Sequence, residues 1–571
     1  MSAWRRSWAG SGQVLAWLLL AAAVGLGWSG AAFGAAPAGR GAVATVHPVA
    51  TEAGLEAMRS GGNAVDAIVA AALTLGVVDP HNSGLGGGCF LVIRLPDGRM
   101  VSVDGRETAP ASATRDMFLR EGKADARLSQ EGALAVAVPG ALAAYAWVST
   151  NHGRLSLRRH LERAAGVAER GVPVSRSLAA ALREQAAVLR KDPGARALLL
   201  KPDGTPWRTG EVLRLPELAA TYRAVAEQGP GWFYEGSLGR LAADWMAAHG
   251  GRITRADWTG YRVRTRDPVE STYRGCRIVG FPPPSSGGVH VAQILNILEH
   301  FDLKRMGRGS ADYIHVVTEA MKLAFADRAH WLGDPDFTPV PRGLAGRDYA
   351  ATLARRIRLD RVLEVAGAGD PGTGTGLFGG HTTHFSAVDA GGCWVACTAT
   401  INTHFGAKVV VPGTGLILNN EMDDFAAQPG VPNFFGLVGA EANAVGPGRR
   451  PLSSMSPTLV LRDGRPLLSV GAAGGPTIIS QTVLAILGVV DFGLSPAEAL
   501  AQPRFHHQWK PDELRVEEAV PADVRQELAR RGHRIKAQRT LGAAQAVGWD
   551  AQRGIFQAAA DPRGEGVGGT W

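Results

Sequence analysis

Two spacings of apolar residues alternate along this chain, and they predict helices and strands in separate blocks. Residues 50–78 keep their apolar positions near helical spacing, clearly so in SGGNAVDAIVAAALTLGVV (60–78), and residues 150–250 are Ala-, Leu- and Arg-rich and mostly helical. Later helices are expected at 289–301, 310–331, 477–490 and 495–502. The last of these opens with SPAE, a capping box with proline at the first helical position.

Between the helices lie three pairs of short apolar segments, each pair joined by turn residues. CFLVIRL and RMVSVDG flank PDG (96–98), THFSAV and CWVACTATI flank DAGG (389–392), and TLVL and PLLSV flank RDGR (462–465). This arrangement predicts β-hairpins, and a further strand region is expected near 274–288. Because helical blocks precede and follow the strands, we expect two sheets covered by helical layers.

A glycine-rich tether runs directly into the second hairpin. Seven of the fourteen residues from Gly367 to Gly380 are glycine, and HTTHFSAV follows them. Two threonines at a strand start are common, because β-branched residues favour strands. A cut before Thr382 would instead free its α-amine, whose pKa of about 7.7–8.0 suits it as the base for the threonine hydroxyl. A self-cleaving threonine nucleophile is therefore a candidate.

The first 35 residues have the features of a secretory signal peptide. Arg5 and Arg6 supply a positive start, a fifteen-residue apolar run spans 14–28, and small residues lead to a cleavage point near Ala35. The run is too short and wrongly flanked for a stable membrane span, although a membrane anchor is the alternative. We expect an exported protein of the bacterial periplasm, with secretion beyond it as the alternative, and without stable membrane insertion.

Charge excludes one class of partner. The net charge of +8 falls to +6 when Arg5 and Arg6 leave with the signal, because no acidic residue leaves with them. This is a mild bias for 571 residues. No basic run with interleaved aromatic residues is present, so nucleic acid is not an expected partner.

The four cysteines do not suggest a disulfide framework. Cys393 and Cys397 lie four apart on an expected strand, about 13 Å apart along one face, which is too far for a disulfide. Cys89 and Cys276 are isolated in the sequence. We expect all four to be buried small residues.

No metal or cofactor site is expected from the local motifs. His506 and His507 are adjacent and would face opposite sides of a strand, while His381 and His384 have no carboxylate partner at metal-ligand spacing. The glycine-rich segments SGLGGG and GAAGGP lack the Gly-Lys-Ser/Thr ending of a phosphate-binding loop.

A series of short motifs accompanies the threonine segment. They are SGGNAVDA (60–67), SGLGGG (83–88), DGRETAP (104–110), THFSAVDAGG (383–392), TATINTHFG (398–406), LNNEMDDF (418–425), RPLSSMSP (450–457), GAAGGP (471–476) and PRFHHQW (503–509). In this order they give the chain, from about Ala42 to Trp571, a specific resemblance to the γ-glutamyltransferases, which are the glutathione-processing members of the N-terminal nucleophile hydrolases.

The resemblance implies an α+β fold, a four-layer αββα sandwich. It implies self-cleavage between His381 and Thr382 into a large fragment of residues 36–381 and a small one of residues 382–571, which stay associated as a heterodimer. The implied activity removes the γ-glutamyl group from glutathione and transfers it to water, an amino acid or a short peptide, without a cofactor.

The resemblance also assigns roles to individual residues. It implies that Thr382 is the nucleophile, that Thr400 hydrogen-bonds it, and that the backbone of Gly474 and Gly475 binds the oxyanion. The implied substrate-binding residues are Arg106, Ser453 and Ser454 for the α-carboxylate, and Asn402, Glu421 and Asp424 for the ammonium. Glu421 and Asp424 are three apart, so they meet one ammonium only if the segment is turned, which the Asn419-Asn420 pair permits.

One segment departs from the family pattern. Residues 428–439 have the length of a lid that covers the pocket in some bacterial relatives, but Phe435 stands where those relatives have a tyrosine whose hydroxyl bonds the asparagine equivalent to Asn402. Phenylalanine packs but cannot make that bond.

Two other functions compete with this interpretation. A cephalosporin (glutaryl-type) acylase on the same scaffold would use the same nucleophile, but its acyl group brings no ammonium for Asp424 to hold. A catalytically inactive exported binding protein would have no use for a self-cleaving Thr382.

Overall fold

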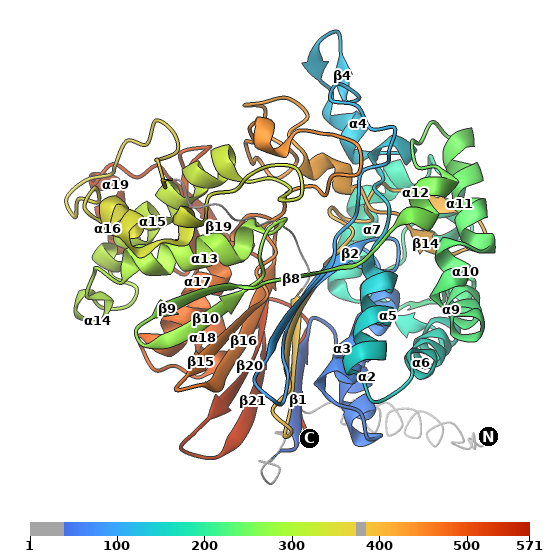
Figure 1. The fold of residues 1–571 in the computed structure, drawn as a ribbon, viewed down its shortest axis with the longest axis horizontal. Coiled ribbons are helices and arrows are strands. Elements are labelled where there is room, and N and C mark those ends of the chain that lie inside the picture. Colours follow the sequence, from blue (N-terminus) through green and yellow to red (C-terminus); the bar gives the residue numbers. More distant parts are fainter. Residues whose placement is uncertain (1–38, 373–383) are drawn as a thin grey trace, which may run out of the picture. The chain divides into compact units, whose positions relative to one another are not determined.

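The computed structural model describes residues 39–372 and 384–571, and two antiparallel sheets organise this part of the chain (Figure 1). The first sheet has seven strands, which pair antiparallel throughout. In spatial order they are β22 (Val567–Thr570), β1 (Gly41–Thr45), β11 (His384–Asp389), β12 (Trp394–Thr400), β2 (Gly88–Arg94), β3 (Met100–Gly105) and β8 (Arg264–Arg266).

The second sheet has six strands and is also antiparallel. Its order is β21 (Ile555–Ala560), β20 (Ala543–Asp550), β16 (Arg465–Ala473), β15 (Thr458–Arg462), β10 (Cys276–Gly280) and β9 (Val269–Tyr273). Both sheets therefore combine strands from residues 39–372 with strands from residues 384–571.

The strands alternate their side chains between two apolar layers. In β2, Cys89 and Leu91 contribute to the core under the helices, whereas Phe90 and Val92 contribute to the core between the two sheets. This is the period of two expected of a strand buried on both faces. Phe90 stacks on Phe281, which follows β10, with 4.1 Å between ring centroids. The two sheets thus pack face to face through a mainly apolar layer.

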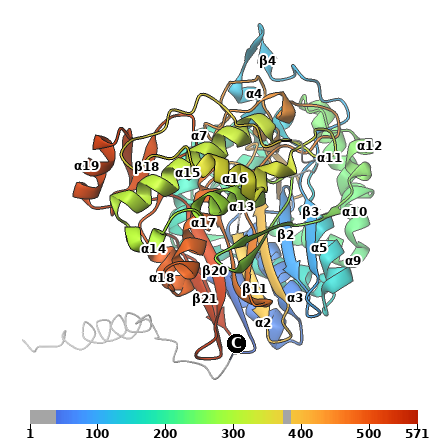
Figure 2. The ribbon, with the colours of Figure 1, turned by 60° about the vertical axis from the view of Figure 1, so that its left-hand side comes forward.

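Helices cover the outer face of each sheet (Figures 1 and 2). The first sheet is covered by α2 (Pro48–Arg59), α3 (Ala64–Val78), α5 (Ala141–His152) and α6 (Leu157–Arg170). The second sheet is covered by α13 (Ser286–Leu298), α15 (Ala311–Trp331), α16 (Arg347–Ala354), α17 (Thr477–Val490) and α18 (Pro496–Ala501). The result is the four-layer αββα sandwich that the resemblance implied.

Smaller elements surround this sandwich. Further helices on the side of the first sheet are α7 (Arg176–Leu189), α8 (Pro193–Leu199), α9 (Pro216–Gln228), α10 (Pro230–Tyr234), α11 (Ser237–Ala248) and α12 (Arg255–Gly260). A three-stranded sheet near the C-terminus contains β17 (Phe505–His506), β18 (Leu514–Glu517) and β19 (Ile535–Gln538), and α19 (Ala522–Arg530) lies between the last two in sequence. The remaining short elements are α4 (Ala126–Gln130), α14 (Leu303–Met306), β4 (Leu119–Arg120), β5 (Lys123–Ala124), β6 (Val172–Pro173), β7 (Val212–Leu213), β13 (Val410–Val411) and β14 (Leu416–Ile417).

The elements expected from the sequence are largely confirmed. All three hairpins form, α17 spans the expected residues 477–490, and Ser495 caps α18 through a reciprocal bond with Glu498. The four cysteines are buried and free. Cys89 is not isolated, however, because β2 lies beside β12, the strand that contains Cys397, and the neighbouring Cys89 thiol contributes with burial to a raised pKa of Cys397. Among the described residues, no helix has the length and apolarity needed to cross a bilayer.

Candidate active site

The expected nucleophile and cleavage point, Thr382 and His381, lie outside the described residues, since β11 begins at His384. The other site residues expected from the sequence are described. They form two neighbouring groups: a buried charge cluster around Arg106, and a cavity lined by Asn402, Gly474 and Gly475.

Arg106 is fully buried at the end of β3 and is surrounded by three carboxyl groups. One terminal nitrogen bonds Glu421 Oε1 and lies 3.4 Å from Glu107 Oε2, and the other donates to Asp424 Oδ2 at 2.7 Å. Its Nε donates to the carbonyl oxygen of Pro451 at 3.1 Å. These four charged side chains are called the Arg106 cluster below.

The local fold explains why two acidic residues three positions apart reach one arginine. Glu421–Asp424 forms a single turn of 3-10 helix, and the Glu421 amide donates to Asn419 Oδ1 at 3.0 Å. Asn419 Nδ2 donates to the carbonyl oxygens of Gly86 and Ala137, which ties this turn to the first sheet. The turned segment expected from the asparagine pair is thus present.

A second buried arginine holds the backbone at Arg106. Arg450 NH1 donates to the carbonyl oxygen of Arg106 at 2.6 Å and to Asp104 Oδ1 at 2.8 Å. Asp104 Oδ1 also accepts from the amide of Arg106 at 2.9 Å. The position of the Arg106 guanidinium is therefore fixed by its main chain as well as by its ion pairs.

The charges within the Arg106 cluster do not balance. Burial raises the pKa of Glu107, Glu421 and Asp424 to about 8 each, against the opposing attraction of Arg106. The same carboxylates raise the pKa of Arg106, which stays protonated. One guanidinium cannot neutralise three carboxylates in a buried site, so protons are retained there near neutral pH. An added cation would let these carboxyl groups ionise.

Several buried polar atoms beside this cluster have no hydrogen bond among the described residues. They are the hydroxyl oxygens of Ser453 and Ser454, Glu107 Oε1 and Glu421 Oε2. Both serines follow Pro451, the carbonyl partner of Arg106, by two and three residues. An unbonded polar group of this kind costs about 1–3 kcal/mol. A ligand with a carboxylate and an ammonium would satisfy donors and acceptors together.

The neighbouring cavity has a volume of about 410 Å³ and joins the lid segment to the predicted oxyanion glycines. Gly474 (φ 129°) and Gly475 (φ 59°) follow β16 and precede α17, in backbone conformations that favour glycine. A Cβ at Gly475 would stand 2.6 Å from Cδ1 of Phe435, so the lid phenylalanine packs directly on this glycine. Phe434 and Phe435 both line the cavity.

Asn402 and Thr400 lie where β12 ends. Thr400 Oγ1 accepts from the Asn402 amide at 2.6 Å, and Asn402 adopts a positive φ of 76°. Asn402 Nδ2 donates to the carbonyl oxygen of Asn420 at 3.0 Å, next to Glu421. Its Oδ1 is buried without a hydrogen bond among the described residues. Asn402 therefore links the cavity to the segment that carries the Arg106 cluster.

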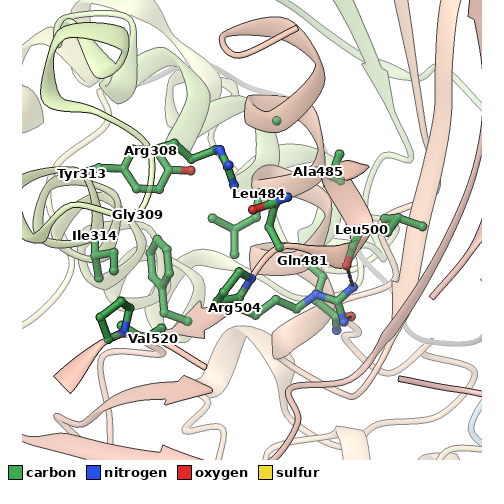
Figure 3. Close-up of a pocket in the computed structure, with 16 residues that line it drawn as sticks. Arg308, Gly309, Tyr313, Ile314, Gln481, Leu484, Ala485, Leu500, Arg504 and Val520 are labelled. Atoms are coloured by element: carbon green, nitrogen blue, oxygen red, sulfur yellow. Dashed lines mark hydrogen bonds between the residues drawn. The ribbon is translucent and has the colours of Figure 1, made fainter. Parts of the chain in front are cut away.

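Gln481 of α17 holds the turn before that helix, and Figure 3 shows its side chain beside Arg504 in the lining of a separate pocket. Its Nε2 donates to the carbonyl oxygen of Ala473 at 2.9 Å and to Thr477 Oγ1 at 3.0 Å, while its Oε1 accepts from Arg504 at 3.0 Å. Gln481 thus fixes the turn that contains Gly474 and Gly475. Sequence reasoning missed this residue, because a glutamine within a helical run carries no local signal.

Arg504 belongs to a second buried ion-pair group, called the Arg504 cluster below. It comprises Arg504, Glu517, Asp561 and Arg563. Arg504 bonds Asp561, and Arg563 donates to both oxygens of Glu517, at 2.6 and 2.5 Å. No buried nitrogen or oxygen of these four described side chains lacks a hydrogen bond.

Sequence reasoning also missed Glu107 and one group of potential metal ligands. Glu107 lies inside the quoted motif DGRETAP, but strand alternation places consecutive side chains on opposite faces and so argues against a shared cluster. The chain leaves β3 at Gly105, and alternation no longer applies. The potential ligands are His315, Glu319 and His533, none of which belongs to the histidine pairs considered from the sequence.

Comparison with known proteins identifies the family. The family model described as Gamma-glutamyltranspeptidase matches residues 50–571. The chain is 42% identical to the glutathione hydrolase proenzyme of Escherichia coli (strain K12), over 92% of this chain and 90% of that protein. It is 39% identical to the acylase ACY 1 proenzyme of Pseudomonas sp. (strain V22), over 92% and 93%.

Among solved structures, the cephalosporin acylase from Bacillus halodurans superposes with a TM-score of 0.84 at 28% identity, covering 96% of this chain and 99% of that one. The fold and the extent of the family match agree with the arrangement of the site. The chain belongs to the gamma-glutamyltranspeptidase family.

Proposed function

We propose that this protein is a γ-glutamyltransferase and glutathione hydrolase that matures by self-cleavage. The observation that carries the proposal is the Arg106 cluster together with the serines beside it. One guanidinium, ionisable carboxyl groups and unbonded serine hydroxyls are buried there. That combination matches the two opposite charges on the α-carbon of a γ-glutamyl group. The relatives named glutathione hydrolase proenzymes support the same activity.

Maturation begins, in this proposal, at the bond between His381 and Thr382. The Thr382 hydroxyl attacks the carbonyl carbon of His381, the peptide C–N bond breaks, and the nitrogen takes the hydroxyl proton to become an amine. Water then hydrolyses the resulting ester, which releases the His381 carboxylate and restores the hydroxyl. β11 begins two residues after Thr382, and its first residue, His384, pairs with Thr398 of β12, the strand that ends at Thr400.

Catalysis then uses the new α-amine as the base. It accepts the proton of the Thr382 hydroxyl as the oxygen attacks the γ-carbonyl of the donor, and it returns that proton to the departing amine. The γ-glutamyl ester left on Thr382 is transferred to water, an amino acid or a short peptide. Arg106, Ser453 and Ser454 hold the donor carboxylate, and Glu421, Asp424 and Asn402 hold its ammonium.

The negative charge of the tetrahedral intermediate is stabilised by the backbone amides of Gly474 and Gly475. Both line the cavity next to Asn402, and their turn is held by Gln481. Loss of one such donor typically raises a barrier by about 2.7–4 kcal/mol. A cavity closed on one side by Phe434 and Phe435 leaves space in front of the glycines for an acceptor.

We also propose how the enzyme is exported and how its two fragments stay together. Residues 1–35 act as an export signal to the periplasm, and residues 36–381 and 382–571 remain a heterodimer after the cut. The shared sheets support this association, because β11 and β12 of the second fragment lie between β1 and β2 of the first.

A cephalosporin-type acylase is the competing function, favoured by the acylase relative and by the superposed acylase structure. A glutaryl group carries a carboxylate but no ammonium. It would leave three buried carboxyl groups around Arg106 without the added cation, so the charge pattern favours a γ-glutamyl donor.

The proposal is tested with purified protein and its Thr382→Ala variant. Wild-type protein is expected to run as two fragments on a denaturing gel, the smaller one beginning at Thr382, and to release the chromogenic amine from a γ-glutamyl anilide. The variant is expected to remain uncut and inactive. Cleavage and turnover in Thr382→Ala, or a preference for a glutaryl over a γ-glutamyl substrate, would contradict the proposal.

A further inference from the structure

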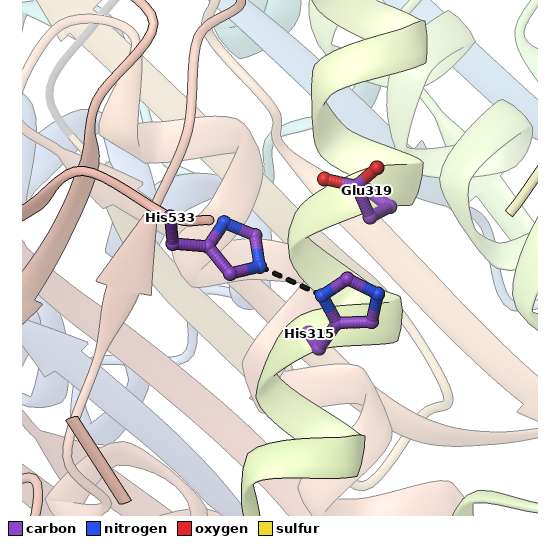
Figure 4. A group of neighbouring side chains, drawn as sticks. All are labelled: His315, Glu319 and His533. Carbon is purple, nitrogen blue, oxygen red and sulfur yellow. Dashed lines mark hydrogen bonds between the residues drawn. The ribbon is translucent and has the colours of Figure 1, made fainter. Parts of the chain in front are cut away.

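A compact group of two histidines and one glutamate lies away from the active site, where α15 meets the C-terminal region (Figure 4). His315 and Glu319 are four residues apart and share one face of α15. His533 comes from the segment between α19 and β19. All three are buried, and their potential ligand atoms lie within 4.8 Å of one another.

The hydrogen bonds of His315 fix which of its nitrogens carries a lone pair. His315 Nε2 is 2.6 Å from the carbonyl oxygen of Arg358, which only accepts, so Nε2 carries the hydrogen. Nδ1 is therefore free of hydrogen in the neutral ring, and it lies 2.7 Å from His533 Nε2. An N–H donated outward to a backbone carbonyl is the arrangement that orients metal-bound histidines.

Both histidines are neutral near pH 7, as ligands must be. Burial lowers the pKa of His315, and burial together with the neighbouring His315 lowers the pKa of His533 to about 2. Without a metal, the His533 Nε2–H donates to His315 Nδ1. With a metal, His533 carries its hydrogen on Nδ1 instead, and both lone pairs point to the ion.

Glu319 supplies an anionic oxygen to the same place. Its Oε2 accepts from the amide of Leu363 at 2.6 Å, whereas its buried Oε1 accepts no hydrogen bond from any described residue. The nearest cation to Oε1 is Lys322 Nζ at 3.3 Å. Lys322 also lies 3.4 Å from Asp512 and donates to the Leu363 carbonyl at 3.1 Å, so its charge stays compensated if Glu319 turns to a metal.

We propose that His315 Nδ1, His533 Nε2 and Glu319 Oε1 bind a divalent transition-metal ion of the zinc class, with water as a fourth ligand. Two imidazoles and one carboxylate suit that ion. Tetrahedral bonds of about 2.0–2.1 Å require the two ring nitrogens to separate from 2.7 Å to about 3.3 Å.

The ion would connect the two fragments of the mature enzyme. His315 and Glu319 precede the cut and His533 follows it, a consequence that rests on the proposed cleavage, whereas binding itself does not. The metal would stabilise the docking of α15 against the C-terminal segment, far along the chain from Thr382. It has no part in the proposed transfer reaction.

The test uses chelator-stripped protein without a histidine tag, titrated with Zn²⁺ against a chromogenic chelator and, separately, with Co²⁺. We expect one Zn²⁺ per heterodimer, visible absorption of four-coordinate Co²⁺ and a raised unfolding temperature. H533Q and E319Q should each weaken Zn²⁺ binding by more than about 100-fold. Removing the hydrogen-bond partner of a metal ligand already costs about 10–100-fold in affinity, and removing the ligand itself costs more. H300Q, a substitution of a surface histidine, is the matched control.

Two outcomes would overturn the site. One is stoichiometric binding that persists in both H533Q and E319Q, and the other is a wild-type protein that binds no Zn²⁺ and gives no Co²⁺ absorption. If H533Q fails to fold, E319Q and the Co²⁺ spectrum decide. The same titration with the uncut Thr382→Ala variant separates this inference from the proposed function, since that variant should bind the ion equally well.

Discussion

The Arg106 cluster and the Arg504 cluster are both buried groups of arginines and carboxylates, but they differ in completeness. The Arg504 cluster has two arginines for two carboxylates, and none of its buried described atoms is left unbonded. The Arg106 cluster has one arginine for three carboxyl groups, and unbonded carboxyl and hydroxyl oxygens surround it. The protein alone satisfies the Arg504 cluster, whereas we propose that a bound ligand completes the Arg106 cluster.

This difference in hydrogen bonding distinguishes a structural cluster from a candidate ligand site better than burial or charge alone. Both clusters are largely buried and both contain ion pairs. On perturbed pKa values alone, either would be a candidate for a functional site. Buried polar atoms without partners cost free energy in every molecule that carries them. Several of them next to one arginine are therefore consistent with the proposed binding of a substrate at the Arg106 cluster.

The largest expected effect comes from removing one arginine from each cluster. Arg106→Met should lower kcat/KM for a γ-glutamyl anilide by about 10³-fold, or about 4 kcal/mol, because the donor carboxylate loses its partner. The three carboxyl groups can remain protonated, so the fold should survive. Arg563→Met should instead lower the free energy of unfolding by about 2–3 kcal/mol, with kcat/KM of the folded protein changed by less than about threefold.

Steady-state kinetics and denaturant unfolding of both variants measure this contrast. If Arg563→Met abolished donor binding, or if Arg106→Met bound the donor normally, the two clusters would not differ in the way described.

Removing one negative charge from each cluster should give the next largest contrast. Glu421→Gln and Asp424→Asn keep the side-chain shape and should raise KM by about 10–100-fold, since a hydrogen bond to a charged group contributes about 1.5–3 kcal/mol. Glu517→Gln should reduce stability and leave KM nearly unchanged. If all three substitutions raised KM equally, the Arg106 and Arg504 clusters would not differ in substrate binding.

The pH dependence of donor binding should reveal the surplus of carboxyl groups. Because burial raises the pKa of Glu421 and of Asp424 to about 8, the cluster holds protons at pH 6.5 that it has lost at pH 9. An ammonium binds the ionised form, so KM should fall by about tenfold as pH rises across this interval. Glu421→Gln should flatten the profile.

Stability should change in the opposite sense. The pKa of the Glu421 carboxyl rises from 4.5 to about 8 on folding, so the folded protein holds its proton more tightly than the unfolded chain does. This contribution is complete below pH 4.5 and is lost as pH rises to about 8. Thermal unfolding of the ligand-free protein against pH measures it, and a donor analogue bearing an ammonium should cancel the loss at high pH.

A smaller effect is expected at the serines. Ser453→Ala and Ser454→Ala remove hydroxyls that bond nothing among the described residues, so the free energy of unfolding should not fall. KM should rise by about threefold to tenfold, the equivalent of one hydrogen bond to the donor carboxylate. A large loss of stability with unchanged KM would make these hydroxyls structural.

The smallest effect is expected at the lid. Phe435 packs on Gly475, and Asn402 Oδ1 at the same cavity accepts no hydrogen bond from the described residues. Phe435→Tyr would add a donor that can reach Asn402 and hold the lid closed. Product analysis should then give a ratio of transfer to hydrolysis changed by about twofold to fivefold, with Phe435→Leu as the matched control.

The sequence predicted features that depend on neighbours along the chain. The apolar segment that forms β2, the turn residues of three hairpins and the SPAE cap of α18 are all local features of the sequence, and each corresponds to an observed element. The turn at Glu421–Asp424 was expected from the asparagines before it and is present as a 3-10 helix.

Contacts between segments that are far apart in the sequence could not be predicted from local patterns. His533 bonds His315 across 218 positions, and no spacing rule connects them. Cys89 lies beside Cys397 because β2 pairs with β12, an order that differs from sequence order. Glu107 joins the Arg106 cluster only because the strand has ended. Each required the three-dimensional path of the chain.

The strand order of the first sheet has a consequence for the timing of maturation. β1 precedes the proposed cut, yet its two neighbours in the sheet are β11 and β22, which both follow it. A chain cut before these strands had paired would leave β1 with two open edges. In the proposed maturation, self-processing therefore follows the completed assembly of the first sheet.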